Sequence, residues 1–132
     1  MNREPQQPSD AEWKVLNALW RQHPANARDL LTRVRHEGWA YTTLKTMLSR
    51  MQDKGFVRTE KRGQTTWYEP ALEQNAAQRH AVRRLVERVF EGASGPLLAH
   101  LAKEERMSAA ERKKLQTWTA EVERKEKKRG AR

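Results

Sequence analysis

The spacing of apolar residues changes from a helical to an extended period near residue 56, and no other feature narrows the possible folds as far. Before this point, three segments repeat apolar residues every three or four positions, which predicts amphipathic helices. They cover residues 9–23, 26–38 and about 41–54. After it, two runs of β-forming residues flank a glycine-containing turn, which predicts a hairpin. Three helices followed by a hairpin predict a helix-turn-helix with a β-wing.

Capping residues set the expected limits of the three helices. Ser9 and Glu12 have the spacing of a capping box, so the first helix is expected to begin after Ser9. Asn26 is a suitable N-cap for the second helix, which Gly38 is expected to end. Gly55 is placed to end the third helix.

The hairpin is expected to pair residues 56–59 with residues 65–68 across a turn at 61–64. Pro70 cannot donate to a ladder and should stop it. Trp67 and Tyr68 are adjacent, so their side chains should lie on opposite sides of the strand. At least one of them should pack on the core.

Residues 73–132 read as wholly helical, with a helix at 74–91, a short one around 97–101 and a last one opening at Ser108. Gly92 and Gly95 are expected to break the first of these. Only 12 large apolar side chains serve these 60 residues, too few to close a core alone. A second copy of the chain is the simplest partner. The predicted dimer interface is Val82, Leu85, Val86, Val89, Leu115, Trp118 and Val122.

The predicted fold class is therefore mainly α with a small β-wing. Residues 1–72 would form a winged helix-turn-helix DNA-binding domain. Residues 73–132 would form a helical dimerisation domain with a basic C-terminal tail.

Positive charge indicates the kind of partner. The formal net charge is +10, which favours a polyanion or an anionic membrane surface. Residues 38–68 contain six basic and two acidic residues. The polar face of the third helix has no Glu, whereas a merely solvated face would normally mix signs. That face could enter a DNA major groove; it carries Thr42, Lys45, Thr46, Ser49 and Arg50.

The hairpin tip is a second candidate contact. Arg58, Lys61 and Arg62 could touch phosphates or a minor groove. The alternative is an ordinary basic turn that protects an edge strand. In the C-terminal half, Arg79, Arg83, Arg84 and Arg88 could instead suit an amphipathic membrane-surface helix. Because their apolar neighbours are mostly small or β-branched, a dimerisation helix is favoured.

Other function classes lack supporting residues. The chain has no Cys, which excludes disulfides, thiol catalysis and thiolate metal sites. Its four His residues show no metal spacing, its six Gly form no phosphate loop, and no nucleophile–base set is present. The sequence predicts no enzyme, cofactor or metal. It has no run of 18 apolar residues and no secretory signal, so a cytoplasmic location is expected.

Three motifs together resemble the penicillinase-repressor and methicillin-resistance-repressor (Bla/Mec-type) family. They are residues 9–20, the third-helix stretch 41–51 with Lys54-Gly55, and the wing from Gly63 to Pro70. The resemblance is close over residues 7–70 and looser beyond. It implies a homodimer that represses transcription from a palindromic operator, in a regulon of the β-lactamase or antibiotic-resistance type. The implied DNA contacts are Thr42, Thr43, Lys45, Thr46, Arg50, Lys61 and Arg62.

The resemblance also implies a switch, because family members are inactivated when a membrane sensor metallopeptidase system triggers cleavage in the C-terminal domain. The corresponding stretch here includes Ala99 and His100 and lacks the Asn-Phe pair of the staphylococcal members. Copper-responsive relatives use C-terminal cysteines, which this chain does not have.

Two other functions stay open at this point. A ligand-responsive winged-helix regulator of the multiple-antibiotic-resistance type would need a pocket between the DNA-binding domain and the dimer helices. A winged helix used for protein contact would show an acidic or apolar third-helix face, and this face is neither. The favoured interpretation is a dimeric repressor.

Overall fold

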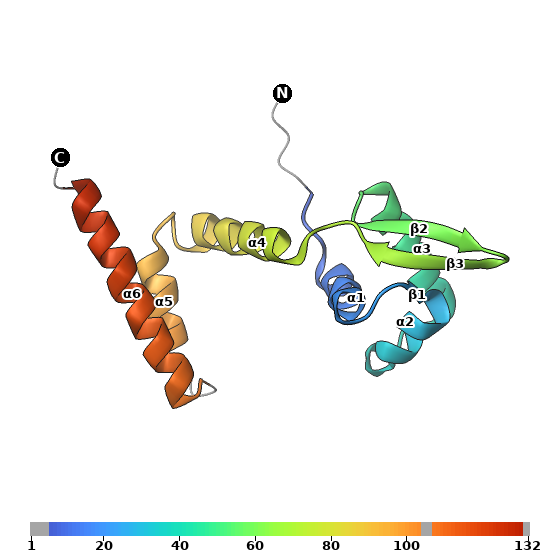
Figure 1. Cartoon of the computed structure of the whole chain (residues 1–132), viewed down its shortest axis with the longest axis horizontal. Helices are drawn as coiled ribbons and strands as arrows, with labels where there is room; N and C mark the ends of the chain where they lie inside the picture. Colours follow the sequence, from blue (N-terminus) through green and yellow to red (C-terminus); the bar gives the residue numbers. More distant parts are fainter. Residues whose placement is uncertain (1–5, 104–106, 131–132) are drawn as a thin grey trace, which may run out of the picture. The chain divides into compact units, whose positions relative to one another are not determined.

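The structure is a computed structural model that describes residues 6–103 and 107–130 (Figure 1). For residues 119, 122, 123 and 125–130 it describes the backbone alone. The chain divides into two compact units, Met1–Arg79 and His80–Arg132. None of the helices in the described ranges is long and apolar enough to cross a bilayer.

The N-terminal unit contains three helices and a small sheet. The helices are α1 (Asp10–Arg21), α2 (Ala27–Arg33) and α3 (Tyr41–Asp53). Ser9 and Glu12 form the predicted capping box at the start of α1, and the Asn26 side chain accepts a hydrogen bond from the Asp29 amide at the start of α2. The N-terminal limits of the first two helices are therefore set by local hydrogen bonds that the sequence encodes.

The sheet is antiparallel, with strand order β1–β3–β2. Its strands are β1 (Ala25–Asn26), β2 (Val57–Arg62) and β3 (Thr65–Pro70). Figure 1 shows β2 and β3 extending past the helices as a wing. The two-residue strand β1 pairs Ala25 with Tyr68, and the sequence does not predict it because two residues are too short to show a period.

One apolar cluster holds this unit together. Its largest fully buried side chains come from α1, α2 and α3 at the predicted helical spacing. They are Val15, Leu16, Leu19, Leu30, Leu44, Leu48 and Met51. Tyr68 is the member of the Trp67–Tyr68 pair that enters the core, as the alternation of strand side chains requires. Trp20 donates its Nε1–H to the Leu72 carbonyl over 3.1 Å and so ties the chain after the wing to α1.

Helices α4 (Gln74–Val89), α5 (Ser94–Ala102) and α6 (Ala109–Gly130) follow the wing. Ser108 and Glu111 exchange the two hydrogen bonds of a capping box, as predicted. Helix α6 lies beside α5 within the C-terminal unit (Figure 1). A mainly helical chain with a small β-wing confirms the predicted fold class.

Three local predictions are wrong. Helix α2 ends at Arg33, and Gly38 instead ends a short 3₁₀ turn, Arg35–Glu37. Lys61 and Arg62 belong to β2, so only Gly63 and Gln64 form the turn. Gly95 does not break a helix but lies inside α5, because its φ is not in the left-handed region and the backbone there can be helical.

Candidate nucleic-acid interface

Helix α3 is fixed from behind by the core. Leu44, Leu48 and Met51 on its inner side are fully buried. Gly55 follows the helix with a φ of +81°, in the left-handed region that favours glycine, and turns the chain into β2. The outer side of α3 is therefore presented to solvent in one orientation.

An ion pair between a buried carboxylate and a partly exposed lysine fixes α3 against the beginning of α1. The carboxylate of Glu12, which is only 3% exposed, accepts hydrogen bonds from Lys54 Nζ at 2.9 and 3.1 Å. The Ser9 backbone N–H donates to Glu12 Oε1 at 2.9 Å, and the Glu12 amide donates to Ser9 Oγ at 3.2 Å. Glu12 thus caps α1 and binds the residue that follows α3.

These contacts also set the charge state of Glu12. Burial by itself raises the pKa of the Glu12 carboxyl. The hydrogen bond from the Ser9 backbone and the hydrogen bonds and charge of Lys54 act in the opposite direction and outweigh burial, so the pKa is lowered from its ordinary value. Glu12 is therefore ionised near neutral pH, with its charge offset by Lys54.

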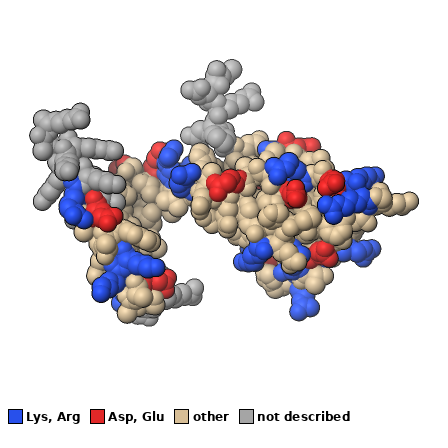
Figure 2. All heavy atoms as spheres, viewed as in Figure 1, with Lys and Arg blue, Asp and Glu red and all other residues tan. Residues whose placement is uncertain are grey.

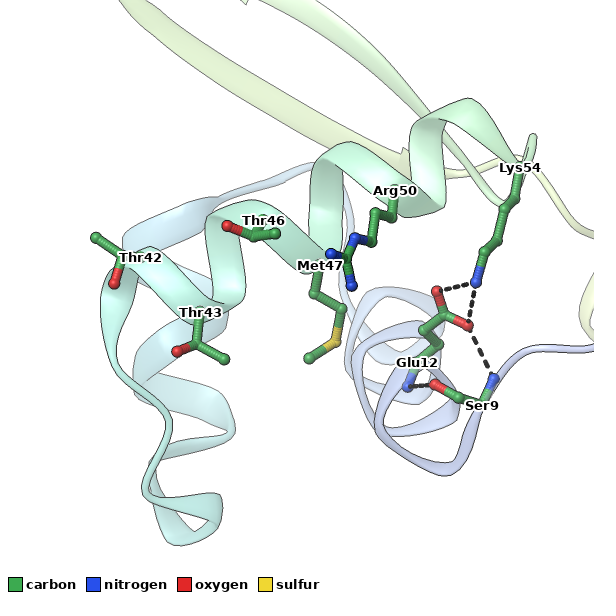
Figure 3. A pocket seen from close by; sticks show the side chains of 8 residues that line it. All are labelled: Ser9, Glu12, Thr42, Thr43, Thr46, Met47, Arg50 and Lys54. Atoms are coloured by element: carbon green, nitrogen blue, oxygen red, sulfur yellow. Dashed lines mark hydrogen bonds and ion pairs between the residues drawn. The ribbon is translucent and has the colours of Figure 1, made fainter.

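An open groove of about 580 Å³ follows the outer side of α3 (Figure 3). In Figure 3, Thr42, Thr43 and Thr46 lie along α3, and Met47 and Arg50 lie between these threonines and the Glu12–Lys54 pair. Among the described residues that line the groove, Glu12 is the acidic one. The complete lining is Ser9, Glu12, Thr42, Thr43, Thr46, Met47, Arg50 and Lys54.

The structure separates the candidate residues of α3 into two groups. Thr42, Thr43, Thr46, Ser49 and Arg50 are exposed. The side chain of Lys45 is half-buried on the flank nearest the sheet, where its Nζ donates to the Tyr68 hydroxyl over 3.3 Å. Met47 is only partly buried and also lines the groove.

Because the wing strands are pleated, Lys61 lies on one side of the wing, and Arg58 and Arg62 lie on the other. Thr59 and Tyr68 are cross-strand partners on the side facing α3, where Gln52 Nε2 donates to Thr59 Oγ1 over 3.1 Å. Lys61 shares this side because it is two residues from Thr59 on the same strand. Arg58 and Arg62 are therefore on the opposite side.

Acidic partners accompany both wing arginines. The Arg58 guanidinium lies 4.0 Å from Glu69, and that of Arg62 lies 3.3 Å from Glu60. The Arg62 guanidinium also lies 5.6 Å from the centre of the Trp67 ring. Figure 2 shows Lys and Arg gathered over the wing with acidic side chains beside them. The wing can bind an anion on either side, but its arginines must first leave their carboxylate partners.

The predicted dimer-interface residues differ in exposure. Val82 and Val89 of α4 and Trp118 of α6 are 52%, 58% and 59% exposed. Leu85 is exposed and Val86 half-buried, whereas the side chain of Val122 lies outside the described residues. Leu115 is 6% exposed, so the expectation that one chain cannot bury it is wrong. The α5–α6 pair buries it, because Leu98 and Ala102 of α5 line one cavity with Leu115.

Ala99 and His100, the residues of the expected switch region, are exposed within α5. Over the part of the chain that the structure describes, no three His, Asp or Glu side chains gather in a way that could hold a metal ion.

Comparison with known proteins identifies the family. The family described as "Penicillinase repressor" matches residues 8–121. The methicillin resistance regulatory protein MecI of Staphylococcus aureus (strain N315) is 24% identical over 104 residues, which cover 78% of this chain and 85% of MecI. The penicillinase repressor of Bacillus licheniformis is 22% identical over 104 residues, covering 78% and 81%.

An uncharacterised 16.5 kDa protein of Latilactobacillus sakei is 30% identical over 107 residues, covering 80% of this chain and 73% of that protein. Among solved structures, AbfR of Staphylococcus epidermidis aligns with a TM-score of 0.41 at 24% identity, covering 89% of this chain and 70% of AbfR. The family match spans both the winged helix and most of the C-terminal helices. This chain therefore belongs to the penicillinase-repressor family of DNA-binding transcriptional regulators, which are not enzymes.

Proposed function

We propose that the chain is a homodimeric repressor that binds a palindromic operator through the outer side of α3. The observation that carries this proposal is the exposed row of threonines with Arg50, held rigidly by the core behind it. Its groove offers hydroxyl and guanidinium donors to an anionic partner, and its acidic residue is already paired.

The residues that contact base edges are Thr42, Thr43, Thr46, Ser49 and Arg50. Threonine can meet a base edge with its hydroxyl or a thymine methyl with its own methyl, and Arg can form two hydrogen bonds with guanine. Lys61, Arg62 and Arg58 of the wing contact phosphates, which position the protein without reading sequence. These roles follow from where the side chains lie and what they can donate.

The dimer forms through the exposed apolar side chains of α4 and α6. Val82, Leu85 and Val89 make one stripe on α4, and Trp118 on α6 exposes most of a large aromatic side chain. Water contact with so much apolar surface is unfavourable, and a second copy of the chain removes it. Two recognition helices in a dimer would then contact half-sites about 34 Å apart, or a multiple of that distance.

Repression requires only that the dimer occupies its operator and excludes the polymerase. The names of the relatives MecI and penicillinase repressor support a regulon of the antibiotic-resistance type. Induction follows from a membrane sensor metallopeptidase system that leads to cleavage near Ala99 and His100. Because both lie within helix α5, this segment must open locally before a protease can accept it.

The operator proposal is tested by selecting duplexes from a random library with the full-length protein. We expect an enriched inverted repeat, bound more tightly than a scrambled duplex. The double variant Thr42→Ala/Thr46→Ala should lose most of this preference. Thr117→Ala is the matched control, because that hydroxyl bonds the Lys113 carbonyl within α6. Enrichment of no common sequence, or an equal loss in the control, would reject the assignment of α3.

Induction has its own test in cells that carry the protein and its neighbouring genes. An immunoblot after exposure to a β-lactam should show a fragment that ends near residue 99, together with release of a reporter gene. Release of the reporter with the chain intact would contradict cleavage. If small phenolic compounds dissociate the purified protein from its operator, the ligand-responsive type of regulator is favoured instead.

A further inference from the structure

A second cavity, of about 260 Å³, lies where α2 and α3 begin and the β2–β3 turn approaches them. It is separate from the groove on the outer side of α3, with which it shares no lining residue. Its lining is Asn26, Ala27, Arg28, Tyr41, Lys45, Gln64, Thr65 and Thr66. Seven of these eight side chains carry a hydrogen-bonding group, so the cavity suits a polar occupant.

Two cations from different helices flank this cavity, and a tyrosine holds each of them. Lys45 Nζ of α3 lies 3.3 Å from the Tyr68 hydroxyl and 5.8 Å from the centre of the Tyr68 ring. The Arg28 guanidinium of α2 lies 5.3 Å from the centre of the Tyr41 ring. Tyr68 is only 5% exposed and fixed in β3, so the position of Lys45 is set by a rigid neighbour.

No acidic side chain offsets these charges within the described lining. The wing arginines, by contrast, have Glu60 and Glu69 beside them. Two cations that face one cavity without a counter-charge repel each other, and an anion between them removes that cost. The Thr66 hydroxyl, on the same side of β3 as Tyr68, and the Gln64 amide add neutral donors on the third side.

We propose that this cavity binds a phosphate group, supplied by the DNA backbone as a phosphodiester. The assignment rests on the proposed DNA-binding function and refines it. The cavity lies between α3 and the wing, the two elements proposed to contact DNA, so a backbone strand that spans them passes its mouth. Lys45 then holds a phosphate together with Arg28 and does not read a base, and Tyr68 and Tyr41 are positioning residues.

The first test is the salt dependence of binding by the full-length protein to its selected operator and to a scrambled duplex. The variants are Lys45→Gln, Arg28→Gln and both together. Arg21→Gln is the matched control, since Arg21 is in the last turn of α1. Each single variant should weaken binding to both duplexes by the same factor. The double variant should reduce the slope of log K against log salt by about 0.9 per subunit, the value for one phosphate.

Several results would overturn the assignment. An unchanged slope in the double variant would show that no phosphate is held there. A reduction of about 1.8 per subunit would mean two separate phosphates rather than one shared between the cations. A loss confined to the operator would make Lys45 a base reader. In each case wild-type protein still binds its operator, so the proposed function stands.

The role of Tyr68 has a separate readout. Tyr68→Phe keeps the ring and the charges but removes the hydroxyl that fixes Lys45. It should weaken DNA binding when Lys45 is present and have no further effect in the Lys45→Gln background. An equal loss in both backgrounds would mean that Tyr68 acts through the fold and does not position Lys45.

Titration with inorganic phosphate, without DNA, distinguishes the source of the anion. We expect amide shifts at Lys45 and Thr66 at millimolar phosphate and none with equal chloride, together with displacement of the phosphate by operator DNA. Shifts that DNA does not displace, or shifts in a protein that binds no DNA, would assign the cavity to a free phosphate compound instead. No shift at all would reject a phosphate site.

Discussion

Glu12 is buried at the edge of the groove along α3 although it carries a charge. Its position is favourable because the capping hydrogen bonds of Ser9 and the ammonium of Lys54 replace the water it loses. The same carboxylate therefore holds α1 and α3 together. Loss of its charge should therefore lower the free energy of unfolding of the N-terminal unit.

We predict a pH dependence from this residue. Because the folded-state pKa of Glu12 is lowered, its contribution is complete above the ordinary Glu pKa of about 4.5 and is lost as the pH falls through the folded-state value. Glu12→Gln should lower the free energy of unfolding by about 1–3 kcal/mol at pH 7 and by much less near pH 3.

Urea unfolding at several pH values measures this effect. Glu111→Gln is the matched control, because Glu111 makes the same capping box at the start of α6 but is exposed. The control should change the stability of the N-terminal unit little. A loss from Glu12→Gln that is the same at pH 3 and pH 7 would contradict an ionised Glu12.

Two glycines that look alike in the sequence should respond differently to substitution. Gly55 has a φ of +81° and open space where an alanine methyl group would lie, so Gly55→Ala should cost about 1 kcal/mol through backbone strain alone. Gly95 has helical geometry inside α5, so Gly95→Ala should be neutral or stabilise by up to about 1 kcal/mol. Thermal unfolding of both variants checks this; equal effects would contradict the two backbone assignments.

At the scale of single elements, α3 and the wing are expected to divide the work of binding. The exposed side of α3 carries short donors that can reach base edges, whereas the wing carries long cations with carboxylate partners. Specificity and general affinity should therefore be separable by mutation.

We predict that Thr46→Ala reduces the difference in binding free energy between operator and scrambled duplex by about 1–3 kcal/mol, because the variant loses a base contact. Arg62→Ala should weaken binding to both duplexes about equally, because a phosphate contact carries no sequence information. Fluorescence anisotropy with both duplexes provides the measurement. If both variants reduce the preference for operator over scrambled duplex by the same amount, the assignment of base contacts to α3 and phosphate contacts to the wing is wrong.

At the scale of the whole molecule, we expect net charge and the proposed dimerisation to set DNA affinity. With a net charge of +10, counterion release should dominate binding. If a dimer neutralises about eight phosphates, the logarithm of the DNA-binding constant should fall with the logarithm of the salt concentration, with a slope of about −7. A slope of about −1 would remove the electrostatic argument.

Two substitutions in α6 should separate the dimer from the fold of the C-terminal unit. Leu115 is buried within one chain, so Leu115→Ala should cost about 2–5 kcal/mol of that unit's own stability. Trp118 is exposed, so Trp118→Ala should leave α6 helical while it shifts the protein toward monomer and weakens operator binding. Sedimentation and circular dichroism measure both; a Trp118→Ala protein that remains dimeric would place the interface elsewhere.

Much of the fold could be predicted because its signals are local. The change of apolar period, the Ser9–Glu12 capping box and the Asn26 cap each depend on residues within one turn of one another. The alternation of Trp67 and Tyr68 likewise follows from strand geometry. The prediction for Gly95 is wrong because glycine permits a left-handed backbone but does not require it.

The sequence could not predict which residues come together in the candidate site; only the tertiary structure shows this. Sequence periodicity places Lys45 with Thr42 and Thr46, but the hydroxyl that holds Lys45 belongs to a residue 23 positions away in β3. Arg28 joins it only because α2 begins beside the sheet, where β1 pairs with β3. Periodicity reports which side of an element a residue occupies, because that depends on backbone geometry alone. Which elements meet on that side depends on how the core packs, and packing brings together residues that are distant along the chain.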